Sequence, residues 1–129
     1  MQSIPNPTPI GIIAVATAGT PVSAGVNLNS FYGDPLTGHS DLMSNLYFYR
    51  LDITASTSNT GNTYLVITNP AYVGTKWSSA TGKGLVATLG PGASYTLIDP
   101  VGRDIWYIGD FGFDADTNGN SVVAVVQRG

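Results

Sequence analysis

The sequence lacks cysteine and glutamate, and charged residues make up only 10% of its 129 positions. The absence of cysteine excludes a disulfide framework, a thiolate metal site and a cysteine nucleophile. Strong helix formers are scarce, because every acidic residue is aspartate and lysine occurs only at Lys76 and Lys83. Thr, Val, Tyr, Ser, Asn and Gly dominate instead. This composition is typical of an all-β protein.

The charge and the apolar runs argue against two kinds of partner. The formal net charge is −3 at pH 7 and the five basic residues are scattered, whereas a nucleic-acid surface needs clustered Lys and Arg. No apolar run approaches the roughly 18 residues of a membrane span. No positive side chain precedes the apolar run Ile10–Ala18, so a buried strand is expected there and not a signal peptide. We expect neither nucleic acid nor a membrane as a partner.

The first nine residues (MQSIPNPTP) have a proline at every second position from Pro5 to Pro9. Proline fixes φ and has no amide donor, so an extended polyproline-like arm outside any sheet is predicted. The chain is thereby divided into an arm at 1–9 and a single domain at 10–129. The arm is apolar enough to dock, and its expected partner-binding residues are Ile4, Pro5, Pro7 and Pro9.

Short apolar runs alternate with turn signals through the rest of the chain. The predicted strands are Ile10–Ala18, Pro21–Asn27, Leu46–Ala55, Thr63–Thr68, Gly84–Leu89, Ser94–Ile98, Asp104–Ile108 and Ser121–Gln127. About eight short strands with Gly/Pro-rich turns predict a two-sheet antiparallel β-sandwich, most readily jelly-roll-like and otherwise immunoglobulin-like.

For two of these strands and for two turns, the sequence also predicts which residues share a face and which strands are connected. Leu46–Ala55 alternates, which places Tyr47, Tyr49, Leu51 and Ile53 together on one face. Ser121–Gln127 is apolar on both faces, as a central strand would be. Asn118-Gly119 predicts a hairpin, whereas Gly90-Pro91-Gly92 predicts a longer loop or a corner between sheets.

The segment 28–44 has no clear periodicity. It contains Phe31 and Tyr32, which are expected to pack on the domain or on a partner. His39-Ser40-Asp41 has the residue types of a hydrolase triad, but consecutive residues point in different directions and no Gly-x-Ser-x-Gly motif exists. Nothing singles out a catalytic aspartate pair among the eight. No enzymatic activity and no cofactor are expected.

Asp114-Ala115-Asp116-Thr117-Asn118-Gly119 matches the first half of a calcium loop. The twelfth position of that loop should be glutamate, and here it is Val125 within a predicted strand, which excludes an EF-hand. A looser calcium site stays open as an alternative. A turn is favoured, because Asx side chains stabilise turns by themselves.

Two aromatic residues, Tyr72 and Trp77, lie in the polar loop 69–83. An exposed Tyr/Trp pair is typical of sugar-binding platforms and of protein interfaces. The alternative is that these rings fold back onto their own sheet.

The order of motifs in residues 57–129 resembles small structural proteins of tailed phages, in particular capsid decoration (cement) proteins. The motifs are Asn59-Thr60-Gly61-Asn62-Thr63-Tyr64, Leu89-Gly90-Pro91-Gly92-Ala93-Ser94, Asp104-Ile105-Trp106 and Asp114–Gly119, followed by a valine-rich strand. The resemblance implies a compact, non-catalytic β-sandwich that binds the assembled shell as an oligomer.

The expected function is therefore that of a virion structural protein that reinforces a capsid by bridging its subunits. Its expected partners are the major capsid protein and further copies of itself, as a dimer or trimer. The alternative is a receptor- or carbohydrate-binding module of a phage tail or fibre, which would use Tyr72 and Trp77.

Overall fold

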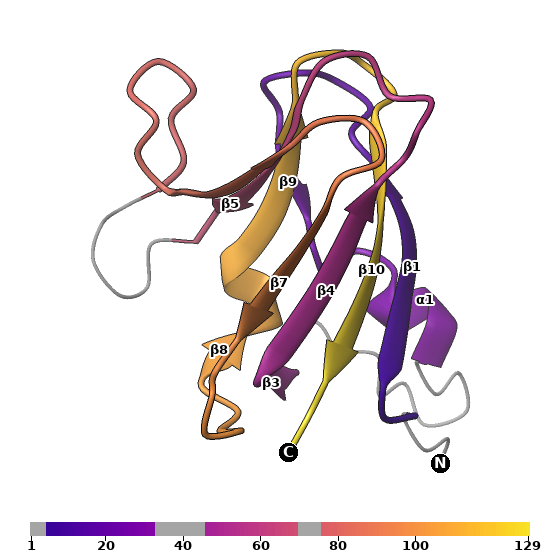
Figure 1. Cartoon of the computed structure of the whole chain (residues 1–129), viewed down its shortest axis with the longest axis vertical. Helices are drawn as coiled ribbons and strands as arrows, with labels where there is room; N and C mark the ends of the chain where they lie inside the picture. Colours follow the sequence, from indigo (N-terminus) through magenta and orange to yellow (C-terminus); the bar gives the residue numbers. More distant parts are fainter. Residues whose placement is uncertain (1–4, 33–45, 70–75) are drawn as a thin grey trace.

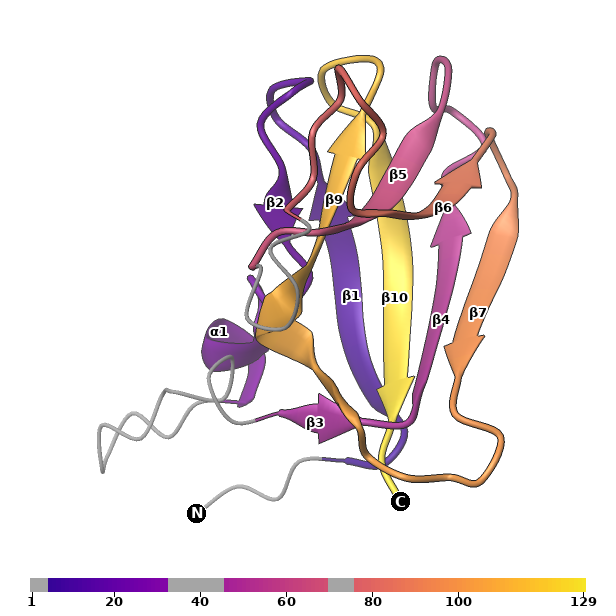
Figure 2. The same ribbon diagram turned by 90° about the vertical axis from the view of Figure 1, so that its left-hand side faces the viewer.

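The computed structural model describes residues 5–32, 46–69 and 76–129, and two four-stranded antiparallel sheets form its body (Figures 1 and 2). Sheet A contains, in spatial order, β1 (Thr8–Ala14), β10 (Ser121–Gln127), β4 (Arg50–Ala55) and β7 (Ser94–Ile98). Sheet B contains β2 (Val22–Ser23), β9 (Phe111–Ala115), β5 (Thr63–Ile67) and β6 (Leu85–Leu89). The prediction of an all-β protein is confirmed.

The smaller elements lie beside these sheets. A short antiparallel pair consists of β3 (Tyr47–Phe48) and β8 (Trp106–Tyr107), and β8 continues into the 3-10 turn η2 (Ile108–Asp110). Helix α1 (Leu28–Tyr32) lies beside β1 at the edge of sheet A (Figure 1).

The strand pairing is nested in the sequence. The innermost pair is β5 with β6 and the next is β4 with β7, followed by β2 with β9 and β1 with β10. Successive pairs in this nested order lie alternately in sheet B and sheet A.

A single hydrophobic core lies between the two sheets. Sheet A supplies Ile13, Leu51, Ile53, Val122, Ala124 and Val126, and sheet B supplies Leu65, Leu89, Phe111, Phe113 and Ala115. Phe48 of β3, at 0% exposure, and Ile108 of η2 also belong to this core, and β3 and β8 lie at one end of the sheets (Figure 1). Alternate residues of β10 face this core and confirm it as a central strand between β1 and β4, while Val123 on its outer face is 49% exposed.

Several local predictions were wrong, each for a physical reason. The chain bends at Tyr49 between β3 and β4, so Phe48 is buried and Tyr47 is 47% exposed, opposite to the predicted alternation. Asn118-Gly119 closes no hairpin, because it joins β9 of sheet B to β10 of sheet A. Gly90-Pro91-Gly92 does form the predicted corner between sheets, since it joins β6 to β7.

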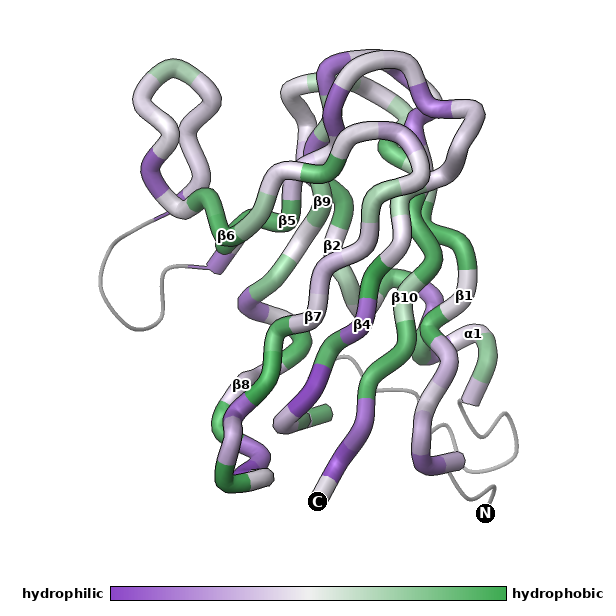
Figure 3. The backbone as a smooth tube through the Cα atoms, in the orientation of Figure 1, coloured by the Kyte–Doolittle hydropathy of each residue, from purple (hydrophilic) through white to green (hydrophobic). Residues whose placement is uncertain are grey.

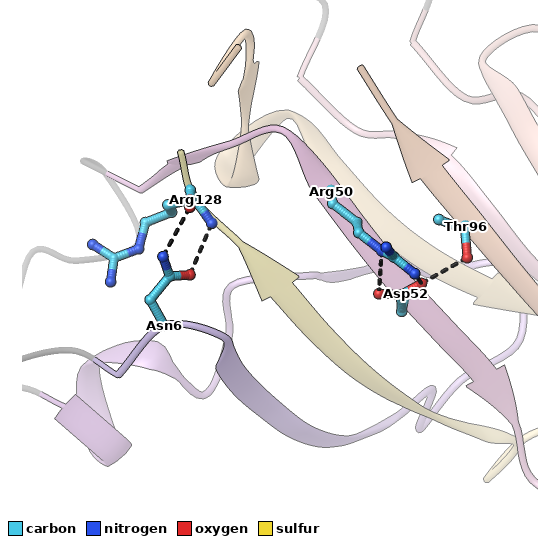
Figure 4. A network of polar contacts seen from close by, with 5 residues as sticks. All are labelled: Asn6, Arg50, Asp52, Thr96 and Arg128. Carbon is cyan, nitrogen blue, oxygen red and sulfur yellow. Dashed lines mark hydrogen bonds and ion pairs between the residues drawn. The ribbon is translucent and has the colours of Figure 1, made fainter. Parts of the chain in front are cut away.

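The predicted arm is also corrected, because residues 5–9 belong to the folded domain. Thr8 is completely buried, and Thr8 and Pro9 pair with Val126 and Val125. Pro9 is tolerated since β1 is an edge strand, where a missing donor removes no ladder bond. The Asn6 side chain bonds to both backbone groups of Arg128, at 2.8 and 3.0 Å (Figure 4). Pro5, Pro7 and Pro9 therefore lie in a segment that is attached to its own sheet.

The outer edge of β1 is covered by residues 27–32. The Asn27 amide donates to the carbonyls of Ile10 and Ile12, and the Tyr32 hydroxyl donates to the Pro9 carbonyl at 2.6 Å. Phe31 lies over Gly11, where a Cβ would come within 2.8 Å of its ring. Phe31 and Tyr32 thus pack on their own edge strand, although Phe31 stays 50% exposed.

Candidate functional site

Two turns that connect the sheets are joined by asparagine side chains. Asn120 Oδ1 accepts from the Thr60 amide at 3.0 Å, and Asn120 Nδ2 donates to the Thr60 carbonyl at 2.8 Å. Asn59 makes the equivalent pair of bonds with Ser121, at 2.8 and 2.9 Å. Two of the motifs that carry the resemblance, Asn59–Tyr64 and Asp114–Gly119, are therefore neighbours in space.

The carboxylates of the Asp114–Gly119 segment are occupied by protein donors. Asp116 accepts from the Asn62 amide at 2.8 Å and from the Tyr64 hydroxyl at 2.6 Å. Gly61, at φ +70°, permits this approach because its Cα lies against the Asp116 side chain. The Tyr64 hydrogen bond, followed by that of Asn62, lowers the pKa of Asp116, and the bond to Asp116 raises the pKa of Tyr64. The hydrogen bonds of Asp116 therefore stabilise the turn and use carboxylate oxygens that a cation would need.

An aromatic pair is assembled on the outer face of sheet B beside this turn. Tyr64 and Asp114 are cross-strand partners of β5 and β9. The Trp77 indole Nε1 donates to Asp114 Oδ2 at 2.7 Å, and its ring stacks on Tyr64 with centroids 5.7 Å apart. Asp114 is 2% exposed and also accepts from the Gly19 and Ala115 amides, both at 2.8 Å. Trp77 is thus fixed by a buried hydrogen bond.

Two open hollows adjoin the Trp77 ring. The first has a volume of about 480 Å³ and is lined by Ala18, Tyr64, Trp77, Ser79, Asp114 and Asp116. The second, of about 500 Å³, is lined by Pro21, Thr68, Lys76, Trp77, Ser78 and Ser79. Gly19, Trp77 and Ser79 line both. We call these two hollows together the Trp77 groove.

A second candidate surface lies at the opposite end of the sheets, where Figure 3 shows several hydrophobic stretches of the backbone near β7 and β8. It comprises Tyr47 (47% exposed), Ile98 (44%), Val101 (73%) and Ile105 (45%), and we call it the apolar end. Tyr47 contacts Tyr107 with ring centroids 5.1 Å apart.

The loop that presents Val101 is braced at its base. Asp99 is 4% exposed, donates its amide to the Tyr49 carbonyl at 2.8 Å and accepts from the Arg103 amide at 2.8 Å. Its side-chain hydrogen bond with Arg103 lowers the pKa of Asp99. Asp104 fastens the chain end by accepting from the Gly129 amide at 2.8 Å. Val101 therefore projects into solvent from an ordered turn.

The outer face of sheet A is part polar and part apolar. Arg50 and Thr96 both donate to Asp52, at 2.9 and 2.6 Å (Figure 4). Burial raises the pKa of Asp52, but the bonds from Thr96 and Arg50 outweigh it and leave that pKa below its ordinary value. Ile12, 66% exposed, and Val123 are cross-strand partners on the same face.

The predicted site residues are distributed over several places. Ile4, Tyr72 and the triad-like His39-Ser40-Asp41 lie outside the described residues. Trp77 lies in the groove that bears its name, whereas Phe31 and Tyr32 cover the edge of β1. No local sequence pattern marks Tyr64 and Asp114 as partners of Trp77 in this groove. Their pairing depends on the register of β5 with β9, and β9 itself was not predicted.

Comparisons with protein-family models, with curated proteins and with solved structures found no match. Within the described residues, no helix has both the length and the apolar character required to cross a membrane. The described residues also contain no group of three His, Cys, Asp or Glu side chains arranged to hold a metal ion.

Proposed function

We propose that this chain is a non-catalytic structural protein of a virion, which binds the assembled capsid and reinforces it by bridging neighbouring subunits. The observation that carries the proposal is the apolar end. Val101 stands 73% exposed on a turn braced by Asp99, and Tyr47, Ile98 and Ile105 are also exposed at this end. Exposed apolar side chains grouped at one end favour a partner that removes them from water. The proposed partner is the major capsid protein.

Two further features support a role in a large assembly. The asparagine bonds between residues 59–60 and 120–121 join the two turns that contain the resemblance motifs and hold them in a fixed arrangement. Pro5 and Asn6 are hydrogen-bonded to Arg128 near the apolar end. This end therefore offers a contact surface whose backbone is already ordered, which reduces the entropy lost on binding.

The first test is the copy number of the chain in purified particles. A copy number comparable to that of the major shell protein is expected of a decoration protein. A small fraction of that number would instead indicate a tail component and favour the receptor-binding alternative. Absence of the chain from purified particles would refute a virion role.

The second test examines whether the apolar end is the surface that contacts the capsid. Val101→Asp is expected to weaken retention on particles by about tenfold or more, because it places a charge in the apolar contact. Val26→Asp is the matched control, since Val26 is also an exposed valine (48%) in a turn. Equal retention of both variants, with unchanged melting temperatures, would show that the apolar end is not the contact surface.

A further inference from the structure

The contacts of the Trp77 ring fix it on the surface of the domain, where it can contact a ligand but contributes little to the core. Its indole N–H is bonded to a buried carboxylate, one ring face rests on Tyr64, and the ring lines both hollows. A tryptophan needed only for packing would bury its edge in the core, but Trp77 is outside the hydrophobic core cluster. The bond to Asp114 instead fixes the ring orientation on the outside of sheet B.

Polar groups surround the ring within the groove. The Tyr64 hydroxyl and the exposed Asp116 carboxylate lie in the first hollow, and the Lys76 ammonium and the Ser78 hydroxyl line the second. The Ser79 hydroxyl and the Lys76 ammonium make no side-chain hydrogen bond to any described residue. Both residues are exposed and line the second hollow. Two hollows of about 480 and 500 Å³ each fall in the usual size range of small-molecule sites.

The charges in the groove favour a neutral ligand. Asp114 is saturated by three N–H donors, and Asp116 receives two hydrogen bonds. A strongly anionic ligand would be repelled by these carboxylates, and the single Lys76 offsets only one of them. A cationic ligand would compete with donors that the fold already supplies. A ligand with an apolar C–H face and a rim of hydroxyls matches the ring and its polar surround.

We propose that the Trp77 groove binds a neutral oligosaccharide. One pyranose stacks its C–H face on Trp77, donates a hydroxyl hydrogen to the Tyr64 oxygen and exchanges hydrogen bonds with the Ser79 hydroxyl. The adjoining sugar occupies the hollow beside Lys76 and Ser78. The proposal is independent of capsid binding, because the groove lies on sheet B at a distance from the apolar end.

The binding experiment uses the fluorescence of Trp77. The chain has two tryptophans, so Trp106→Phe leaves Trp77 as the single reporter. The probes are soluble neutral hexasaccharides of β-glucose, β-xylose, β-mannose and N-acetylglucosamine, with a sulfated glycan and an oligolysine peptide as comparisons. A saturable change with at least one neutral probe, at a Kd of about 1 mM or below, is expected. No saturable change with any neutral probe, or binding of the sulfated or cationic probe alone, would overturn the proposal.

Calorimetry on variants identifies the groove as the place of binding. Ser79→Leu fills both hollows at an exposed turn and is expected to weaken binding by about tenfold or more. Thr81→Leu lies in the same turn outside the hollows and is expected to bind as the parent does. Trp77→Phe keeps a ring without the N–H and should weaken binding less than Trp77→Ala. Unchanged affinity in folded Ser79→Leu or Trp77→Ala would refute the proposed site.

Discussion

The side-chain amide of Asn6 pairs with both backbone groups of Arg128, as a further residue of a paired strand would (Figure 4). This pair extends the β1–β10 ladder beyond Thr8. The proline-rich segment therefore stabilises the fold from residue 5 onward, whereas the sequence predicted a separate arm.

Deletion of residues 2–9 is expected to destabilise the domain. It removes the Asn6 bonds and the buried Thr8, and it should lower the melting temperature by roughly 5–10 °C, equivalent to a few kcal/mol. Asn6→Ala should account for about 1 kcal/mol of this loss. Asn69→Ala is the control, because Asn69 is exposed and its side chain bonds to no described residue. A truncated chain that melts like the full chain would restore the view of residues 5–9 as a separate arm.

Asn120→Ala should be among the most destabilising changes of a polar residue. Asn120 is 4% exposed, and its loss leaves the Thr60 amide and carbonyl without their partners, at a cost of about 2–3 kcal/mol. Asn118→Ala, which removes one exposed bond to Ala18, should cost about 1 kcal/mol or less. Urea denaturation of both variants measures the difference, and equal midpoints would contradict the assigned role of Asn120.

Asp110 is expected to make stability fall as the pH rises. Asp110 is 4% exposed, its Oδ1 has no hydrogen-bond partner among the described residues, and burial raises its pKa above the ordinary 3.8. Because the folded state holds the proton more tightly than the unfolded state, the stabilisation is full below pH 3.8 and is lost as the pH rises through the folded pKa. Asp110→Asn should therefore melt higher than the parent at pH 7, and this advantage should shrink toward pH 3.5. A lower melting temperature of Asp110→Asn at pH 7 would contradict the prediction.

Calcium should leave the melting temperature almost unchanged. The oxygens of Asp114 and Asp116 already accept hydrogen bonds from the protein, so a cation would have to displace those donors. A genuine site at a calcium concentration of 100 times its Kd would add about 2.7 kcal/mol. A rise of several degrees that a chelator reverses and Asp116→Ala abolishes would establish a calcium site.

Self-association is expected through the apolar part of the outer face of sheet A. Ile12 and Val123 are neighbours there and are 66% and 49% exposed. Sedimentation at tens of micromolar should reveal a dimer or trimer, and Val123→Asp should shift it to the monomer. Thr88→Asp, on the exposed side of β6, should not. A monomeric parent chain at that concentration would contradict this expectation.

The sequence patterns located most strands but not the way in which they pair. Ser94–Ile98 and Ser121–Gln127 were predicted with their observed limits, because alternation or an apolar run is bounded there by turn residues. β9 was missed since Phe111–Ala115 has a glycine within it and continues directly into an Asx-rich turn. The brief helix α1 has no acidic residue in its first turn and no basic residue in its last, and five residues are too few to show a helical period.

The candidate site could also be predicted only in part, because the partners of Trp77 are brought to it by strand pairing. Trp77 stood out as a loop tryptophan, whereas its partners lie 13 and 37 positions away along the chain. Only the antiparallel register of β5 with β9 brings Tyr64 and Asp114 together beneath it. The register of two strands depends on which residues the whole sheet buries. A local sequence pattern therefore cannot predict the contacts that this register creates.

The nested pairing has a consequence for folding kinetics. The β5–β6 pair closes the loop of residues 68–84, whereas β1 must find β10 across more than a hundred residues. The entropic cost of loop closure rises with that separation. We expect the transition state to contain the inner pairs while β1 is still undocked. Loss of the Asn6 contacts should then accelerate unfolding and leave the refolding rate nearly unchanged.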